Sequence, residues 1–273
     1  MVPAINCILI SGEKLSLHVS LAEKIDSIEL TLVENAIVQV RQRESESFQL
    51  NYEDNGIYTS DNLVEHGTAY SVSVILDEYQ VITAHDSVPT PSVISIISHT
   101  NTAKLNEEGS FLAGIELGFA DDPITENYYE LLMFKREEEH LGLTYPFNEQ
   151  SKILLNEGFE PFSTEILVFS DELIDKEEVS MNLIYQSSYR SSRYQKIREH
   201  TLIVELRHIS KEYYMFKKSQ YFYENTLYAD FIEGTAIAYP IYSNVENGLG
   251  IMASYSSSLD SVFIEADTIQ FSQ

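Results

Sequence analysis

Histidines are the first residues in this sequence that could bind a metal or transfer a proton. The seven are His18, His66, His85, His99, His140, His200 and His208. No two have the i, i+4 spacing of a helical metal pair, and there is no HExxH motif. His200 and His208 share one predicted strand, but eight residues along a strand span ~26 Å, too far for one metal. The pattern indicates scattered surface or core histidines and predicts no metal centre.

Nucleophilic and cofactor-binding motifs are also missing. The sequence has no G-x-S-x-G elbow, and Gly248-x-Gly250 lacks the third glycine and the helix of a dinucleotide loop. Paired carboxylates are so abundant that no single pair is diagnostic. We therefore expect no catalytic residues, no cofactor and no enzymatic activity. Two alternatives stay open: a glycan-active or other hydrolase with dispersed carboxylates ~5–10 Å apart, and an adhesin-like structural spacer.

One acidic turn offers oxygen ligands to calcium. Asp121, Asp122 and Glu126 lie within six residues, and calcium takes six to eight oxygen ligands. An ordinary Asp-Pro turn between two strands, capped by Asn127, explains the same residues. The turn is the preferred interpretation, and calcium stays as the alternative.

A basic and aromatic segment stands out in this acidic chain. Eight of the 17 Lys and Arg residues lie between Arg190 and Lys218, with only three acids among them. Arg and Tyr dominate interface hot spots, and Arg also binds carboxylate or phosphate. The segment predicts a surface for a partner or an anionic ligand, although ion pairs on an acidic surface would explain it equally well. Its predicted binding residues are Arg190, Arg193, Tyr194, Lys196 and Arg198.

Composition limits the class of protein. The net charge of −26 disfavours binding to nucleic acid and to acidic lipid surfaces. No window approaches the ~18 consecutive apolar residues of a membrane helix. The single cysteine, Cys7, forms no intrachain disulfide and lies in a predicted strand, which favours a buried, inert thiol. The 273 residues, 44% of them hydrophobic, are enough for two domains.

Residues 1–90 have the pattern of a small β-sandwich of the immunoglobulin or transthyretin kind. Leu15, Leu17 and Val19 alternate with polar residues, as expected for a half-buried strand. A hairpin is predicted over 36–52, and Asn55-Gly56 is a strong turn signal. The prolines of Val88-Pro-Thr-Pro-Ser92 mark a domain boundary.

Residues 91–273 predict a larger antiparallel β domain, a sandwich or a barrel, with one helix near 210–224. Ser210 is a favourable N-cap and Glu212 lies in the first turn, where the helix dipole favours a carboxylate. The acidic stretch from Arg136 to about Thr164 is interpreted as an insertion or loop. The segment Tyr239–Tyr255, called the signature segment below, places Asn247, Gly248 and Gly250 between two apolar runs, which suits a tight turn or bulge.

The signature segment and four other stretches carry a family resemblance. The others are Ile5-Asn-Cys-Ile-Leu9, Asp122-Pro with Glu126-Asn-Tyr-Tyr129, Phe169-Ser-Asp-Glu-Leu-Ile174, and Val204-Glu-Leu with Ile209-Ser-Lys-Glu-Tyr-Tyr214. In this order they resemble a family of Gram-negative envelope lipoproteins known as domain of unknown function forty-two forty-nine. The resemblance implies an exported outer-membrane lipoprotein that neighbours a TonB-dependent transporter. It implies no catalytic residues.

Together these observations predict a non-enzymatic envelope lipoprotein. It would bind a ligand or act as an accessory subunit of a TonB-dependent β-barrel transporter, reaching the membrane only through a lipid anchor. The almost immediate first strand suggests that an export signal and a lipid-bearing cysteine lie upstream. Whether the protein faces the periplasm or the outside is left open.

Overall fold

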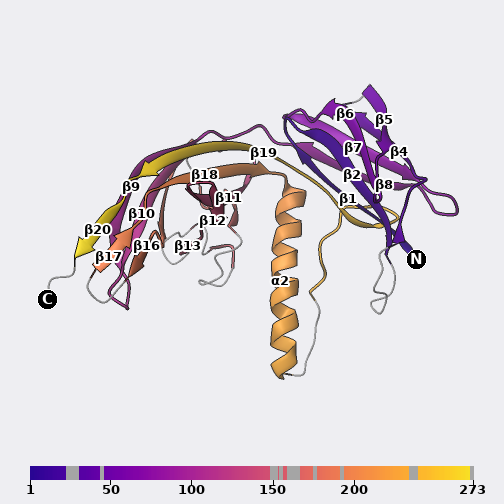
Figure 1. Cartoon of the computed structure of the whole chain (residues 1–273). Coiled ribbons are helices and arrows are strands. Elements are labelled where there is room, and N and C mark those ends of the chain that lie inside the picture. The colour runs from indigo at the N-terminus through magenta and orange to yellow at the C-terminus, as the bar shows by residue number, and fades with distance from the viewer. Residues whose placement is uncertain are drawn as a thin grey trace. The chain divides into compact units, whose positions relative to one another are not determined.

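A computed structural model gives the fold (Figure 1). It describes residues 1–22, 31–43, 46–147, 153, 156–158, 167–174, 177–190, 194–233 and 239–270. These residues form two compact units, the first made of 1–91 with 208–256 and the second of 92–207 with 257–273. The predicted division into 1–90 and 91–273 differs from this arrangement, because the segment 208–256 belongs with the N-terminal strands.

The described part of the chain is mostly β with one long helix, as predicted. The strands of the first unit are β1 (Val2–Ile10), β2 (Lys14–Ala22), β3 (Thr31–Leu32), β4 (Ile37–Gln42), β5 (Glu46–Tyr52), β6 (Ile57–Leu63), β7 (Thr68–Ile75) and β8 (Ile82–Val88). The first unit also holds the beginning of β19 (Leu249–Ile264), which continues into the second.

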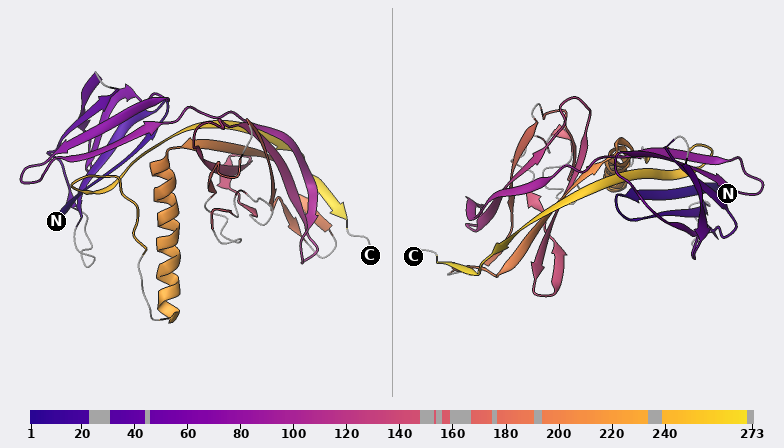
Figure 2. Two further views of the ribbon diagram at one scale, coloured as in Figure 1. Left: turned by 180° about the vertical axis from the view of Figure 1, so that it is seen from behind. Right: turned by 90° about the horizontal axis from the view of Figure 1, so that it is seen from above.

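The strands of the first unit pack in two layers (Figure 1, Figure 2). Hydrogen bonding follows the order β19-β1-β2-β6-β5-β4-β7-β8, and β5 meets β6 at only two residue pairs. Alternate residues of β1, β2, β4, β7 and β8 form a single apolar core, so the two halves of this order lie face to face. The predicted turn is present, since Asn55 and Gly56 have φ of 47° and 76°.

The signature segment closes this sandwich. The Asn244 side chain makes two hydrogen bonds with the main chain of Met252: its Nδ2 donates to Met252 O at 2.7 Å, and its Oδ1 accepts from Met252 N at 2.9 Å. Its Nδ2 also donates to His85 O at 3.2 Å. Asn247 Nδ2 donates to Val81 O at 2.9 Å. These side chains tie β19 to the edge strand β8.

The two glycines of the signature segment allow β19 to lie against β1. Leu249 to Tyr255 pair with β1 in parallel register. A Cβ at Gly250 would lie 1.9 Å from Ile5 O, and one at Gly248 would lie 2.9 Å from Pro3 O. Gly250 also has a φ of 108°, which side chains rarely adopt. Only glycine permits this close strand contact, and the parallel pairing adds to the antiparallel pairs that were predicted.

The helix α2 (Lys211–Glu233) begins at the predicted N-cap. Tyr213 N donates to Ser210 Oγ at 3.2 Å, and Tyr214 N donates to Ser210 O at 3.0 Å. The helix continues nine residues beyond its predicted end at 224. Within the described residues, none of the helices combines the length and apolarity needed to cross a bilayer.

The second unit packs two sheets around a second core. Its strands are β9 (Ile94–Leu105), β10 (Phe111–Ala120), β11 (Tyr128–Glu137), β12 (His140–Leu143), β13 (Pro146–Phe147), β14 (Val168–Ser170), β15 (Glu178–Tyr185), β16 (Ser188–Arg190), β17 (Tyr194–Ile197), β18 (His200–Ile209) and β20 (Asp267–Gln270). The sheet β13-β15-β10-β9 shares a core with β11 and β18. The predicted loop over 136–164 contains β12 and β13, and the rest of it lies largely outside the described residues.

The pairing orders are open. Over the described strands, the largest sheet has 13 members and runs from β12 at one edge to β8 at the other, with β3 and β14 at its side. A third sheet has the order β16-β17-β20. The barrel form of the prediction is therefore wrong for the described strands, because none of these orders returns to its first strand.

Candidate ligand-binding pocket

A buried carboxylate lies where β8 of the first unit meets the start of α2. Asp86 is only 8% exposed, and its Oδ2 accepts no hydrogen bond. Its β8 neighbours on the same face, Ile82, Ala84 and Val88, are all core residues. A charged group on such a face costs free energy unless something compensates it.

Burial dominates the electrostatics of this carboxylate. It raises the pKa of Asp86 to about 6, and the negative charge of Glu212 adds to the rise. The hydroxyls of Ser254 and Ser210 and the main chain of Ser87 favour the charged form, but their effect is smaller. Asp86 therefore changes its charge close to neutral pH.

Ser210 connects the carboxylate to the helix. Its Oγ accepts hydrogen bonds from Tyr213 N at 3.2 Å and from Ser254 N at 3.1 Å. A hydroxyl has two acceptor positions and one proton to donate. Because both acceptor positions are occupied, the proton is left to point toward the nearby Asp86. The N-cap of α2, β19 and Asp86 thus form one polar junction in an apolar core.

A pocket of about 500 Å³ adjoins this junction. Arg41 of β4, Ser71 of β7 and His85 of β8 are direct cross-strand neighbours and line the pocket from the outer face of the sheet. Ala69 and Ser87 form a second pair of neighbours beside this row. The volume falls in the range typical of small-molecule sites, ~300–1,000 Å³.

Two residues of β7 and β8 that alternate with these outer-face residues, and one residue of α2, also line the pocket. Tyr70 and Asp86 line the pocket although both are buried, and they are also cross-strand neighbours. Glu212 reaches the pocket from the first turn of α2. The pocket is therefore built entirely from the first unit, and it combines an apolar wall with groups of both charges.

Two charged groups of the pocket, Arg43 and Glu212, have polar partners within the protein, whereas Arg41 has no ion-pair partner among the described side chains. Arg43 pairs with Glu65 at 2.7 Å, and the Glu212 carboxylate accepts a hydrogen bond from the Tyr242 hydroxyl. Among the described side chains, no carboxylate pairs with the exposed Arg41 guanidinium. An unpaired arginine is notable in a chain with a net charge of −26.

A larger hollow of about 1,090 Å³ lies between the diverging strands β5 and β6. Its lining includes Arg43 and Glu65, which already neutralise each other. Phe48 and Leu63 contribute apolar wall. We regard this hollow as the open mouth of the sandwich, because the two strands pair only near their turn.

The structure places the predicted binding residues of the basic segment in the second unit. Tyr194 and Lys196 lie on the exposed face of β17, and the Arg198 side chain is 74% exposed. Arg190 ends β16 and pairs in register with Gln195, whereas Arg193 lies outside the described residues. Three of the five are therefore accessible, and their role in binding stays a prediction.

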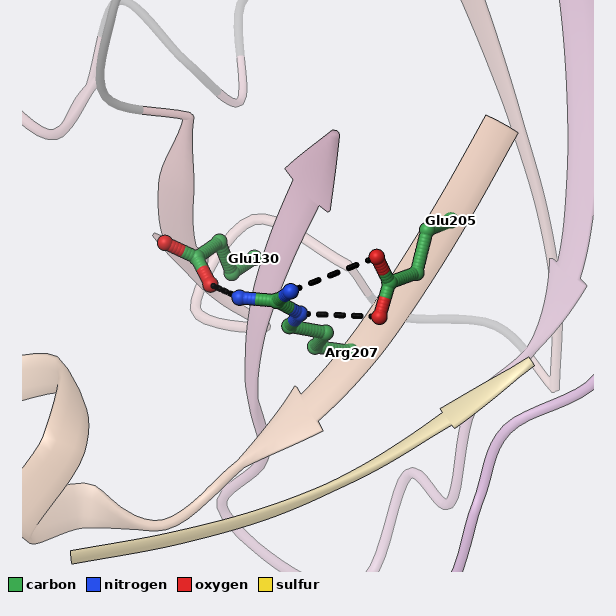
Figure 3. Close-up of polar contacts among 3 residues, drawn as sticks. All are labelled: Glu130, Glu205 and Arg207. Atoms are coloured by element: carbon green, nitrogen blue, oxygen red, sulfur yellow. Dashed lines mark hydrogen bonds and ion pairs between the residues drawn. The ribbon is translucent and has the colours of Figure 1, made fainter. Parts of the chain in front are cut away.

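Other basic residues of that segment are elsewhere. Arg207 lies between two carboxylates of the second unit, at 2.9 Å from both Glu130 and Glu205 (Figure 3). Its side chain is 20% exposed, so this residue is committed to an internal ion-pair network. The lysines of α2 belong to the first unit. The basic segment is thus split between the two units.

The turn considered for calcium is held by protein hydrogen bonds. Asp121 accepts from the Tyr129 hydroxyl at 2.6 Å, and Asp122 accepts from Ile124 N at 3.0 Å. Asn127 Nδ2 donates to Asp122 O at 2.8 Å, as expected of the capping residue. Within the part of the chain that the structure describes, no three His, Cys, Asp or Glu side chains gather as metal ligands. These hydrogen bonds agree with the turn interpretation of Asp121, Asp122 and Glu126, and calcium binding stays the alternative.

Cys7 is buried in β1, as predicted. Burial, with a smaller contribution from the Asp86 charge, raises the pKa of its thiol to about 12. The thiol is therefore not a nucleophile at neutral pH.

Sequence reasoning missed the pocket, although one signal was available. In Ile82-Thr-Ala-His-Asp-Ser-Val88, Asp86 falls on the same alternate positions as Ile82, Ala84 and Val88. From the sequence alone, the stretch Tyr79–Ala84 predicts a strand that ends before the aspartate. A polar residue on the apolar face of a strand is the pattern that marks such a site.

Comparison with known families gives one match. A model described as Domain of unknown function (DUF4249) matches residues 4–260, nearly the whole chain. No curated protein matches the sequence significantly.

Proposed function

Because the chain belongs to the DUF4249 family, whose function is unknown, we propose its role from the pocket: a non-enzymatic envelope protein that binds a small ligand. One observation carries this proposal. A pocket of about 500 Å³ contains Arg41, which has no carboxylate partner among the described side chains, and adjoins the buried carboxylate of Asp86, whose Oδ2 accepts no hydrogen bond from the described residues. Buried polar groups are nearly always satisfied, and exceptions are concentrated where a ligand or a reaction uses them.

The architecture supports an assignment of the first unit as an immunoglobulin-like sandwich. Its layers contain β1-β2-β6 and β4-β7-β8, with β5 between them in the pairing order. In an immunoglobulin fold the corresponding strands are A, B and E against C, F and G. Such modules present ligands or partners on a rigid scaffold, which agrees with a binding role.

The family resemblance supports the wider setting of the proposal. In that setting the protein is a lipoprotein of the outer membrane and an accessory subunit of a TonB-dependent transporter. The exposed residues Tyr194, Lys196 and Arg198 are the proposed contact with the transporter. Clusters of this composition are common at interface hot spots.

Native purification tests ligand binding directly. The lipidated protein is extracted from outer membranes in mild detergent, and small molecules released on denaturation are identified by mass spectrometry. Ser71→Trp fills the pocket, whereas Ser73→Trp places the same side chain on the same strand face outside it. We expect a bound molecule in the wild type and in Ser73→Trp, but not in Ser71→Trp. Equal recovery from both variants would place the ligand elsewhere, and none from the wild type would count against ligand binding.

The same preparation tests the partner. Stoichiometric recovery of a TonB-dependent β-barrel is expected from the wild type, and charge reversal at Lys196 and Arg198 should abolish it. Arg136→Glu is the control, because Arg136 is also exposed and basic in the second unit. Recovery that survives the Lys196 and Arg198 reversals would refute the proposed contact, and recovery of the protein alone would refute a stable transporter complex.

A hydrolase remains the competing function, and one observation keeps it in view. Asp86 and Glu212, two carboxylates, line the same pocket. A carboxylate hydrolase needs such a pair ~5–10 Å apart with access for water. Incubating the purified protein with the ligand it releases separates the two functions, because a binding protein returns the molecule unchanged.

A further inference from the structure

We propose that the pocket of the first unit binds a zwitterion, namely a free amino acid or a short peptide with unblocked termini. This inference rests on the proposed function and adds the chemical class of the ligand. The ligand carboxylate would meet Arg41, and its ammonium group would lie toward Glu212 in the first turn of α2. All of these residues belong to the first unit.

The pocket presents both signs of charge to one small volume. Arg41 is a guanidinium without a described carboxylate partner, and Arg–carboxylate pairs are among the strongest polar contacts in proteins. Glu212 and Asp86 line the same pocket. A simple anion would be drawn to Arg41 but repelled by the two acids and by the net charge of −26. A simple cation would be attracted by the two acids but repelled by the guanidinium of Arg41. A ligand with both charges satisfies both groups.

The sheet register separates the two ends of the pocket. Arg41 is paired with Ser71, and Ser71 with His85, so Arg41 and His85 are two strand spacings apart. At 4.7–4.9 Å per spacing, their Cα atoms are about 10 Å apart. Asp86 follows His85 directly. This distance suits a ligand whose opposite charges lie several ångströms apart.

A second, independent observation is the buried carboxylate of Asp86 beside the pocket. Its Oδ2 is buried without a hydrogen-bond partner, and the carboxylate is only 8% exposed. No described Lys or Arg forms an ion pair with it. Asp86 lies on the core face of β8, opposite to the outer-face residues Arg41 and His85, so a ligand ammonium group in the pocket would act on it through space and favour the ionised carboxylate without a direct hydrogen bond. Ser71 and Ser87 add hydroxyls that can donate or accept hydrogen bonds.

Blocked peptides provide the test. A pool of dipeptides of random sequence is prepared with free termini, with acetylated N-termini, with amidated C-termini, and with both termini blocked. Each pool is equilibrated by dialysis against the full-length protein, and retained members are quantified by mass spectrometry. Arg41→Gln is the test variant, and Arg136→Gln is the matched control, since both arginines are exposed. Thermal unfolding confirms that each variant is folded.

We expect at least tenfold greater retention of the free-terminus pool than of any blocked pool. Arg41→Gln should lose at least tenfold of this retention, while Arg136→Gln retains it. Equal retention of blocked pools, or full retention by Arg41→Gln, would overturn the zwitterion inference and leave a ligand-binding function standing. Absence of retention in every pool would also overturn the inference, and the native-ligand experiment would then decide the proposed function by itself.

Discussion

Replacing Asp86 with asparagine should stabilise the protein at neutral pH. The folded pKa of Asp86 is raised from 3.8 to about 6. A group whose pKa is raised on folding contributes stability that is fully present below its unfolded pKa. That stability is lost as the pH rises through its folded pKa. Ionisation of Asp86 therefore weakens the fold between pH 4 and pH 7, whereas asparagine has the same shape and no charge to bury.

The magnitude follows from the shift. A difference of about two pKa units, at 1.36 kcal/mol for each unit, corresponds to about 3 kcal/mol at pH 8. Near pH 4 the aspartate is mostly neutral in the folded protein, so the two proteins should then have almost equal stability. The Cys7 thiol and the Tyr242 hydroxyl nearby do not titrate between pH 4 and pH 8, because burial raises the pKa of each to about 12. Glu212 is present in both proteins.

Urea unfolding followed by circular dichroism at pH 4, 5, 6, 7 and 8 measures the effect. We expect Asp86→Asn to gain stability over the wild type progressively, reaching about 3 kcal/mol at pH 8. Asp77→Asn is the matched control, since Asp77 is an exposed aspartate in the turn before β8. A stability difference that does not change with pH would refute the assignment of Asp86 as a costly buried carboxylate.

Three further substitutions test other parts of the fold. Gly250→Ala should lower the free energy of unfolding by more than about 3 kcal/mol, because the added Cβ would lie 1.9 Å from a main-chain oxygen. Gly12→Ala is the control: Gly12 has a φ of 84° but open space around it, so the loss should be roughly 1 kcal/mol. Chemical unfolding measures both losses. Arg207→Ala should lower the free energy of unfolding by about 3 kcal/mol, because it leaves two largely buried carboxylates without this cation. Arg198→Ala should lower it by less than ~0.5 kcal/mol, so equal losses would contradict the network. Burial lowers the pKa of His200, so the unfolded chain binds more protons below pH 6.5 and stability falls there; His200→Phe should flatten this acid limb of the urea titration.

Local patterns were sufficient to predict much of the first unit. Alternation of Leu15, Leu17 and Val19 identifies β2, and all three residues are in the core. The N-cap at Ser210 and the turn at Asn55-Gly56 were predicted for the same reason, since their signals lie within a few residues of the feature they encode. Membership of the DUF4249 family is confirmed over residues 4–260.

Long-range pairing could not be predicted in this way. β1 and β19 pair in parallel although about 245 residues separate Ile5 from Gly250. Nothing in either strand specifies the other, because a strand's alternation indicates which face is buried but not which strand lies beside it. The close approach at Gly250 was seen only as a turn signal. The 12-residue strand β9 was missed because its side chains are mostly exposed and give no regular apolar pattern.

The ligand pocket falls between these two cases. Its parts come from β4, β7, β8 and the first turn of α2, so only the fold could bring Arg41 to the same pocket as Glu212. Asp86 itself was visible in the sequence as a charged residue in an apolar position. The missing information was the end of β8, and a boundary error of four residues was enough to hide it.

The expected effect of Asp86→Asn also bears on why the pocket exists. The fold does not need the charge of Asp86, because asparagine would fill the same space and should be more stable at neutral pH. Residues that weaken a fold in this way are concentrated at sites where their chemistry is used. If ligand binding uses the charge, Asp86→Asn should be the more stable protein and the weaker binder. A variant that gained stability and kept full retention of the free-terminus peptides would separate Asp86 from binding, and Arg41 and Glu212 alone would then have to hold the ligand.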